Sequence, residues 1–231
     1  MKKAWILLYA LALLGDVIGL LAENAALHVF CKPLLTPLLI WGIWQHKSMI
    51  NGTYWAWVVA GLFCSWAGDI FLLYEKKVPI FFMLGLGSFL VAHVCYIIYY
   101  VKNGASLSGA WRKNKWWLML ALVYAAALIT MLFPTLGTLR IPVIIYSLVL
   151  ISMLLGAVAL IGAVPKAAIW FFVIGAVAFV ISDSSLAINK FYHPFPLSGV
   201  IIMMTYGIAQ WLIVTGAILN DGRGKQQSET I

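Results

Sequence analysis

Charged residues are scarce in this sequence of 231 residues. They make up 10% of it, and only seven residues are Asp or Glu. Soluble domains carry about 25% charged residues, and no stretch of this chain is long and polar enough to form such a domain. Hydrophobic residues make up 64% of the sequence, and the mean hydropathy is +1.01. The composition therefore predicts a membrane domain with short loops.

Cysteines are few, and several catalytic and metal-binding motifs are absent. Cys31, Cys64 and Cys95 fall in apolar segments without CxxC spacing, so we expect small buried residues rather than a disulfide or metal set. The four histidines show no HxxxH or HxxE pattern, and the sequence has no GxSxG, Walker or DGxxAR-type signature. We expect no metal site, although the spacing leaves open a site of two aspartates and one histidine.

The net charge of +8 raises the question of a nucleic-acid partner. The basic residues, however, form no continuous face and no groove-reading helix. In a membrane protein such charges lie in loops, where they contact lipid phosphates and set the orientation of the chain. We therefore expect membrane lipids as partners and no nucleic acid.

Eight segments are apolar over about 20 residues, the length that crosses a bilayer. The predicted spans are 4–22, 26–44, 54–74, 79–101, 116–134, 141–162, 167–189 and 197–219. Pro33 and Pro37 lie in the second span, where a helix start or a packed kink tolerates them. Residues 1–220 should thus form a single all-α integral membrane domain, a bundle of eight transmembrane helices, followed by a polar, disordered tail at 221–231.

An even number of spans places both termini on one side of the membrane. Sorting Lys and Arg by alternate loops gives ten on that side and five on the other. The positive-inside rule then predicts cytoplasmic termini in an inner or plasma membrane. The start, MKKAWILLYALALLG, is also typical of a signal peptide, but the apolar run continues to Leu21, which favours a retained first helix.

The third and seventh predicted spans share a pattern. In both GLFCSWAGDIFLLYEK and GAVAFVISDSSLAINK, a Gly is followed by Asp eight residues later, Leu three further on and Lys four beyond that. Both spans run in the same direction, as a parallel four-plus-four duplication requires, but chance matching in apolar sequence is the alternative. On either reading, Asp69 and Asp183 should lie at similar depths, about 8–9 Å inside the non-cytoplasmic boundary.

Asp69 and Asp183 are the main functional candidates. An ionised Asp near a helix centre costs about 2.5–3.5 kcal/mol on insertion scales, so both should face the bundle interior or a wet cavity. Gly61, Ser65 and Asp69 recur four residues apart and form a narrow stripe suited to close helix packing. The alternative to a functional site is a packing interface in which Ser, Tyr or Lys donates to each carboxylate.

Other polar side chains in the spans join these candidates. The fourth span carries His93, which is either catalytic or structural, together with Ser88 and Tyr96. Tyr146 lies in the sixth span, and Tyr206 and Gln210 share a face of the eighth. These residues either bind substrate or form interhelical hydrogen bonds.

Three lysines at the non-cytoplasmic side form a predicted cationic rim. Lys32, at the mouth of the second span, could pair with Asp16 or Glu23, and it could join Lys76 and Lys190 above the aspartates. Such a rim would hold the phosphate of a lipid head group. The alternative is snorkelling of each lysine to the interface.

Several short motifs, in order, resemble the YhhN family of lysoplasmalogenases. They are KPLLTPLLI, GDIFLL, SFLVAHVCYI, SDSSLAINKF and TYGIAQWLI, and they extend from Lys32 to about Gln210. The resemblance implies an eight-span membrane hydrolase that cleaves the vinyl ether bond of a lysophospholipid, the lysoplasmalogen, to a fatty aldehyde and glycerophosphoethanolamine or glycerophosphocholine. The family's motif residues map onto Asp69, Asp183 and His93, with Lys32 and Lys190 at the head group and no cofactor.

The chemistry implied by this resemblance suits a pair of carboxyls. Vinyl ethers hydrolyse by protonation of the outer alkene carbon, and water then captures the resulting oxocarbenium ion. One carboxyl must be protonated to act as the acid, and the other must be ionised to stabilise the cation or orient water, as in glycosidases. We expect Asp183 to be the acid and Asp69 the charged partner. Two other functions remain open: a proton-coupled small-molecule or lipid transporter, and a membrane protein that binds lysolipid without turnover.

Overall fold

The computed structural model of the chain describes residues 4–49 and 53–222, and within these ranges it contains helices and no strands. The α-helices are α1 (Ala4–Leu21), α2 (Ala25–Cys31), α3 (Leu35–Gln45), α4 (Trp55–Leu73), α5 (Ile80–Lys102), α6 (Leu107–Leu132), α7 (Arg140–Ala159), α8 (Lys166–Ala187) and α9 (Ser198–Asp221). Short 3₁₀ or π turns are η1 (Lys32–Leu34), η2 (Lys47–Met49), η3 (Gly137–Leu139) and η4 (Ile188–Tyr192).

These elements form eight helical spans, counted over the described residues, that are long and apolar enough to cross a membrane. The second span consists of α2, η1 and α3 together, the sixth of η3 and α7, and the seventh of α8 and η4. Each of the eight coincides with a predicted span, so the prediction of an all-α, eight-helix membrane bundle is confirmed.

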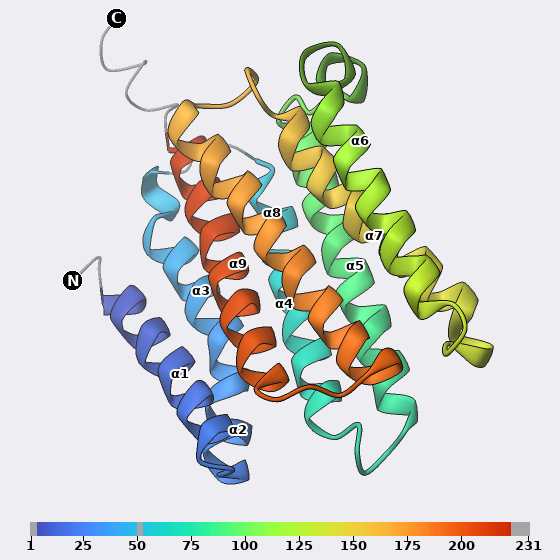
Figure 1. Ribbon diagram of the computed structural model, residues 1–231. Coiled ribbons are helices and arrows are strands. Elements are labelled where there is room, and N and C mark those ends of the chain that lie inside the picture. Colours follow the sequence, from blue (N-terminus) through green and yellow to red (C-terminus); the bar gives the residue numbers. More distant parts are fainter. Residues whose placement is uncertain (1–3, 50–52, 223–231) are drawn as a thin grey trace, which may run out of the picture.

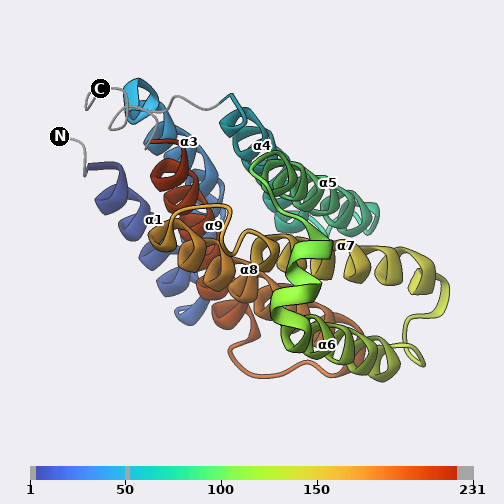
Figure 2. The ribbon, with the colours of Figure 1, turned by 90° about the horizontal axis from the view of Figure 1, so that it is seen from above.

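The bundle has a closely packed centre and one peripheral helix. The hairpins α4–α5 and α8–α9 are the two most extensively packed helix pairs. In Figure 1 the start of α1 and the end of α9 lie toward the same end of the bundle, as an even number of spans requires. Figure 2 shows α6 at the outer edge, beside α7. Only 22% of the residues in the α6 span are buried, the lowest share among the spans of the described chain.

The second span is broken rather than continuous. Helix α2 ends at Cys31, the 3₁₀ turn η1 covers Lys32, Pro33 and Leu34, and α3 begins at Leu35. Pro33 has no backbone N–H and therefore cannot continue an α-helical ladder. Because of this break, Lys32 lies inside the span and is buried, 8% exposed, rather than at its mouth as predicted.

Three other sequence-based boundaries shift. Helix α6 begins at Leu107, well before the predicted start at residue 116, because Lys and Arg are good helix formers and need not end a helix. Asp221, assigned to the tail, is the last residue of α9 and is 7% exposed; the tail residues 223–231 lie outside the described ranges. The seventh span extends to Tyr192 through η4, so Asp183 is nine residues from its end whereas Asp69 is four from Leu73. Equal depth of the two aspartates therefore stays a prediction.

Small residues let the central helices approach closely. A Cβ added at Gly61 of α4 would lie 2.6 Å from the ring of Tyr96 on α5, and one at Gly68 would lie 2.7 Å from the ring of Phe89. Real Cβ atoms are not found so close to ring carbons, so these glycines are required for the packing. The predicted small-residue stripe on the third span therefore lies in a tight helix–helix contact.

Replacing Gly61 with Ala should destabilise the bundle. Tyr96 is fully buried, so its ring cannot move aside, and overpacking of this kind costs about 1–3 kcal/mol. We expect a lower midpoint of thermal unfolding in detergent for Gly61→Ala. The matched control is Gly87→Ala on α5, where an added Cβ meets nothing within 4 Å. This control should leave the midpoint unchanged or raise it, and equal midpoints for the two variants would contradict the packing.

Candidate functional site

Asp69 lies one turn before the end of α4 and is almost fully buried, 1% exposed. The hydroxyl of Tyr206 on α9 donates a hydrogen bond to Asp69 Oδ2 at 2.7 Å. Lys32 Nζ lies 3.8 Å from the other carboxylate oxygen, Oδ1. The carboxylate therefore has a cation on one side and a neutral donor on the other, an arrangement that stabilises its ionised form.

A chain of hydrogen bonds extends from this carboxylate through α9 to α4 and α5. Gln210 Nε2 donates to the Ser65 hydroxyl at 2.9 Å, and Tyr96 donates to Gln210 Oε1 at 2.6 Å. Gln210 Nε2 also lies 3.4 Å from the Tyr206 hydroxyl. All of these side chains are buried. Each of these residues was a candidate from the sequence, and the structure brings them together in one network around Asp69.

The partners predicted for Lys32 are wrong. Its ammonium group lies next to Asp69 rather than Asp16 or Glu23, because the turn η1 carries it into the bundle. Asp16, fully buried on α1, instead has His28 Nδ1 of α2 at 2.7 Å. Lys32 is thus buried beside Asp69, and a rim formed by Lys32, Lys76 and Lys190 stays a prediction.

Asp183 occupies a second cluster, on α8. The Tyr146 hydroxyl of α7 donates to Asp183 Oδ2 at 2.5 Å, and His93 Nε2 of α5 lies 3.7 Å from the same oxygen. The second distance is too long for a direct hydrogen bond. His93 is fully buried, and neither of its ring nitrogens has a hydrogen-bond partner among the described residues.

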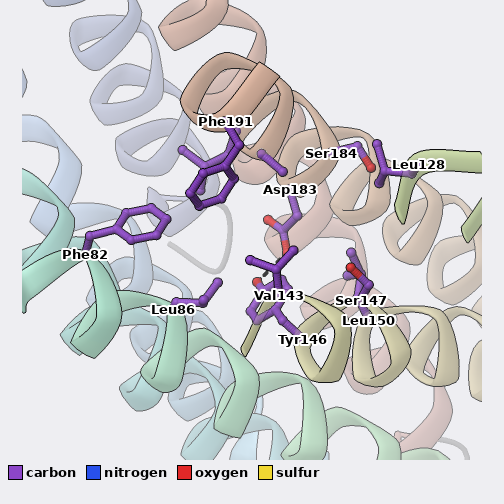
Figure 3. Close-up of a pocket in the computed structure, with 12 residues that line it drawn as sticks. Phe82, Leu86, Leu128, Val143, Tyr146, Ser147, Leu150, Asp183, Ser184 and Phe191 are labelled. Atoms are coloured by element: carbon purple, nitrogen blue, oxygen red, sulfur yellow. Dashed lines mark hydrogen bonds between the residues drawn. The ribbon is translucent and has the colours of Figure 1, made fainter. Parts of the chain in front are cut away.

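A pocket opens beside Asp183, shown in Figure 3. Its walls come from α5, α6, α7 and the end of the seventh span, and include Phe82, Leu86, Leu128 and Val143. Tyr146 and Asp183 face this space from α7 and α8 (Figure 3). About 30 Å³ is open to the centres of water-sized molecules, which is room for one or two waters. The pocket is thus an apolar space with a carboxyl group in its wall.

Lys190 lies close to this pocket. Its ammonium group is 4.6 Å from the ring centroid of Phe82, which lines the pocket and packs against Phe191. Lys190 also forms a 3.1 Å ion pair with Glu75. The side chain is 37% exposed, so a charged head group could reach it from outside.

The two aspartates have separate sets of partners. Phe179 of α8 lies between these sets: its ring centroid is 5.7 Å from that of Tyr206 and 4.8 Å from that of His93. Asp183 lines the pocket and Asp69 does not. Asp183 is thus the carboxyl placed to touch a bound molecule, and Asp69 can act on the pocket only through its charge.

The predicted residue Ser88 lies outside both clusters. Ser88 is half-buried on α5 and takes part in none of the hydrogen bonds of the two clusters. His28 and Glu75 were not predicted. His28 could have been paired with Asp16 across the turn between α1 and α2, whereas Glu75 pairs with Lys190, 115 residues away, which no local pattern indicates. Within the ranges described by the structure, no three His, Cys, Asp or Glu side chains are grouped as metal ligands.

Replacing Lys32 should destabilise the protein, because the buried Asp69 carboxylate would lose its cation. Loss of one partner from a buried ion pair costs about 3–5 kcal/mol, so Lys32→Met should strongly lower the thermal unfolding midpoint in detergent. The double variant Lys32→Met/Asp69→Asn should recover part of the loss, because no unpaired carboxylate is left. Lys190→Met is the control: its pair with Glu75 is partly exposed and should contribute at most about 1 kcal/mol. A Lys32→Met midpoint no lower than that of the control would contradict the pairing.

The sequence matches known proteins over most of its length. The model of the YhhN family matches residues 27–217. The chain is 29% identical to "Lysoplasmalogenase TMEM86B" of Rattus norvegicus, over 84% of this chain and 73% of that protein. It is 34% identical to "Lysoplasmalogenase" of Mycobacterium bovis, over 69% of this chain and 59% of that protein. No solved structure matches. Since the family model covers well over half of the sequence, this multi-pass membrane chain belongs to the YhhN family.

Proposed function

We propose that the protein is a lysoplasmalogenase, a membrane hydrolase that cleaves the vinyl ether bond of a lysophospholipid. The products are a fatty aldehyde and the glycerophospho-alcohol, glycerophosphoethanolamine or glycerophosphocholine. The observation that carries the proposal is the placement of Asp183, with Tyr146 and His93 beside it, in the wall of an apolar pocket near Lys190. The names of the relatives, lysoplasmalogenases from mammals and mycobacteria, support it.

Asp183 is the proposed general acid. Tyr146 donates to Oδ2, so the acidic proton is carried by Oδ1, and no lysine or arginine of the described chain forms an ion pair with this carboxyl. Without such a cation, an apolar wall favours the neutral acid. Protonation of the outer alkene carbon leaves the Asp183 carboxylate facing an oxocarbenium ion, whose charge it stabilises.

Water completes the reaction. The pocket beside Asp183 has room for one or two waters, one of which can hydrogen-bond to the Asp183 carboxyl next to the bound vinyl ether. His93 Nε2 lies 3.7 Å from the same carboxyl. Water adds to the oxocarbenium carbon and gives its proton to the Asp183 carboxylate, which restores the acid. The hemiacetal then loses its hydroxyl proton as the bond to the glycerol oxygen breaks, and that oxygen takes up a proton. The sum is one vinyl ether and one water converted to one aldehyde and one alcohol.

Asp69 is the proposed charged partner. Lys32 and Tyr206 favour the ionised form of its carboxyl, and the aromatic contacts through Phe179 place it away from the pocket. Its negative charge stabilises the cationic intermediate at a distance through a low-dielectric interior. Tyr96 and Gln210 fix the orientation of Tyr206 and so act as positioning residues.

The direct experiment measures aldehyde release in detergent from a vinyl ether lysolipid and from its saturated ether analogue. Only the vinyl ether should react. Asp183→Asn should lower kcat by about 10²–10⁴-fold, the usual contribution of a general acid. Asp69→Asn should lower it by about 10-fold to 100-fold, since a charge further from the reacting atoms contributes less.

Asp221→Asn is a matched control for these two variants. Asp221 is also a buried carboxyl that accepts a hydrogen bond from a tyrosine, Tyr99, but it lies at the other end of α9. Its substitution should leave kcat within about twofold. Full activity of Asp183→Asn in a folded preparation would end its assignment as the acid. No reaction of the wild-type protein with any vinyl ether lysolipid would refute the proposed function.

Lys190 is the proposed contact for the head-group phosphate, which would replace Glu75 as its partner. Lys190→Gln should raise KM for the phosphate-bearing lysolipid by about tenfold and leave kcat largely unchanged, because a head-group contact is the same in the ground and transition states. An alkenyl glycerol without phosphate should show no difference between the two proteins. An equal rise in KM for both substrates would rule out phosphate binding at Lys190.

The broken second span favours a second candidate, a proton-coupled transporter. Discontinuous helices with charged residues at the break are typical of carrier binding sites, and Lys32 next to Asp69 has this form. If purified protein releases no aldehyde, proton-coupled uptake into vesicles is the measurement that tests this candidate. Binding of lysolipid with neither turnover nor uptake would favour the non-enzymatic reading.

A further inference from the structure

A second cavity lies between the outer helix α6 and the bundle. It is bounded by residues 117–124 of α6, 154–158 of α7 and 173–181 of α8, and we call it the outer groove. Its space for the centres of water-sized molecules is about 310 Å³, within the range of small-molecule sites. The wall is apolar apart from Tyr124, and nothing in the reaction described above uses this space.

The outer groove continues the pocket at Asp183 along the same three helices. On α6 the groove ends at Tyr124 and the pocket begins at Leu128, one turn further on. On α7 it ends at Leu154 and the pocket begins at Leu150, again one turn away. On α8, Ile181 belongs to the groove and Asp183 to the pocket. The outer groove and the pocket are therefore consecutive segments of one continuous space between α6, α7 and α8, which we call the α6–α7–α8 seam.

One hydrogen bond marks the boundary between the two segments. Tyr124 lines the groove, Ser184 lines the pocket, and the Tyr124 hydroxyl donates to Ser184 Oγ at 2.8 Å. This bond joins α6 to α8 where the groove meets the pocket. A chain passing from one space to the other has to move the Tyr124 side chain aside.

We propose that the outer groove binds the hydrocarbon chain of the lysolipid whose vinyl ether lies at Asp183. This inference rests on the proposed function. Along the protein the order is Lys190, Asp183 and then the outer groove. The same order, phosphate, vinyl ether and hydrocarbon chain, occurs within the substrate. Val173, at the far end of the groove on α8, is ten residues from Asp183, a length of about 15 Å along the helix.

The position of α6 indicates how the chain enters. This helix lies at the edge of the bundle, packs mainly on α7 and has the least buried span of the described chain (Figure 2). Several groove residues are exposed to the lipid region, among them Leu120 and Ile181. The groove is thus open to the bilayer, and a chain can enter it sideways without leaving a hydrocarbon environment.

The shape of the outer groove should determine which hydrocarbon chain lengths the protein accepts. A chain that comes from the bilayer is already out of water, so its transfer into the groove releases little hydrophobic free energy. Steric fit along the seam then decides which chains place their vinyl ether at Asp183. Blocking the groove should therefore affect long chains and spare short ones.

The kinetic experiment compares octadecenyl and octenyl lysolipids in wild type, Val177→Trp and Val91→Trp. Val177 lines the groove, whereas Val91 is an equally apolar, exposed residue of α5 outside it. For Val177→Trp, kcat/KM should fall by about tenfold or more with the octadecenyl chain and stay within about twofold with the octenyl chain. Val91→Trp should leave both values within about twofold. Unchanged octadecenyl turnover in Val177→Trp, or an equal loss for both chains, would overturn the proposal.

A binding experiment separates this inference from the proposed function. A non-cleavable saturated ether lysophospholipid with a diazirine at its chain end is photolysed with the full-length protein, and the labelled peptides are identified by mass spectrometry. Labels should fall on 117–124, 154–158 or 173–181, be lost in Val177→Trp and persist in Val91→Trp, whether or not vinyl ethers are hydrolysed. Labels spread over the other lipid-facing helices, or displaced equally well by a diacyl phospholipid, would show ordinary bilayer lipid in the groove and overturn the inference.

Discussion

A carboxyl group within an apolar helix has to find a hydrogen-bond donor on another helix, and this requirement organises the bundle. Asp69 joins α4 to α9 through Tyr206, and Asp183 joins α8 to α7 through Tyr146. A polar side chain without such a partner would face hydrocarbon at a cost of several kcal/mol. The acids therefore fix which helices are neighbours, and small residues such as Gly61 set how closely those helices approach.

The sequence was sufficient to predict the span count and several of the polar residues of the interior, among them Asp69, Asp183 and Gln210. Long apolar runs leave little choice of fold, and an aspartate such as Asp69 stands out because so few acids are present. The spacing of Tyr206 and Gln210 correctly put them on one face of α9, and the structure shows both in the Asp69 network. This prediction needed only the periodicity of one helix, because residues four apart lie on the same face.

Contacts between helices were harder to predict, because they depend on where each helix breaks. Lys32 was expected at a span mouth, but Pro33 interrupts the second span and turns the lysine inward to Asp69. His28, which precedes this break, is then free to pair with Asp16. The division into an Asp69 network and an Asp183 pocket likewise depends on the ring of Phe179, and no local pattern distinguishes that residue from its apolar neighbours.

The unequal size of the two spaces on the α6–α7–α8 seam limits how a substrate can bind. The space beside Asp183 holds one or two waters, whereas the outer groove has room for a hydrocarbon chain. A lysolipid can place its vinyl ether next to Asp183 only if the pocket walls and the Tyr124–Ser184 contact move apart. Because α6 is the most weakly buried span of the described chain, its displacement costs less than that of any central helix. In the proposed reaction the substrate would therefore enter by opening of the seam at α6, and closure of the seam would keep bulk water away from the cationic intermediate.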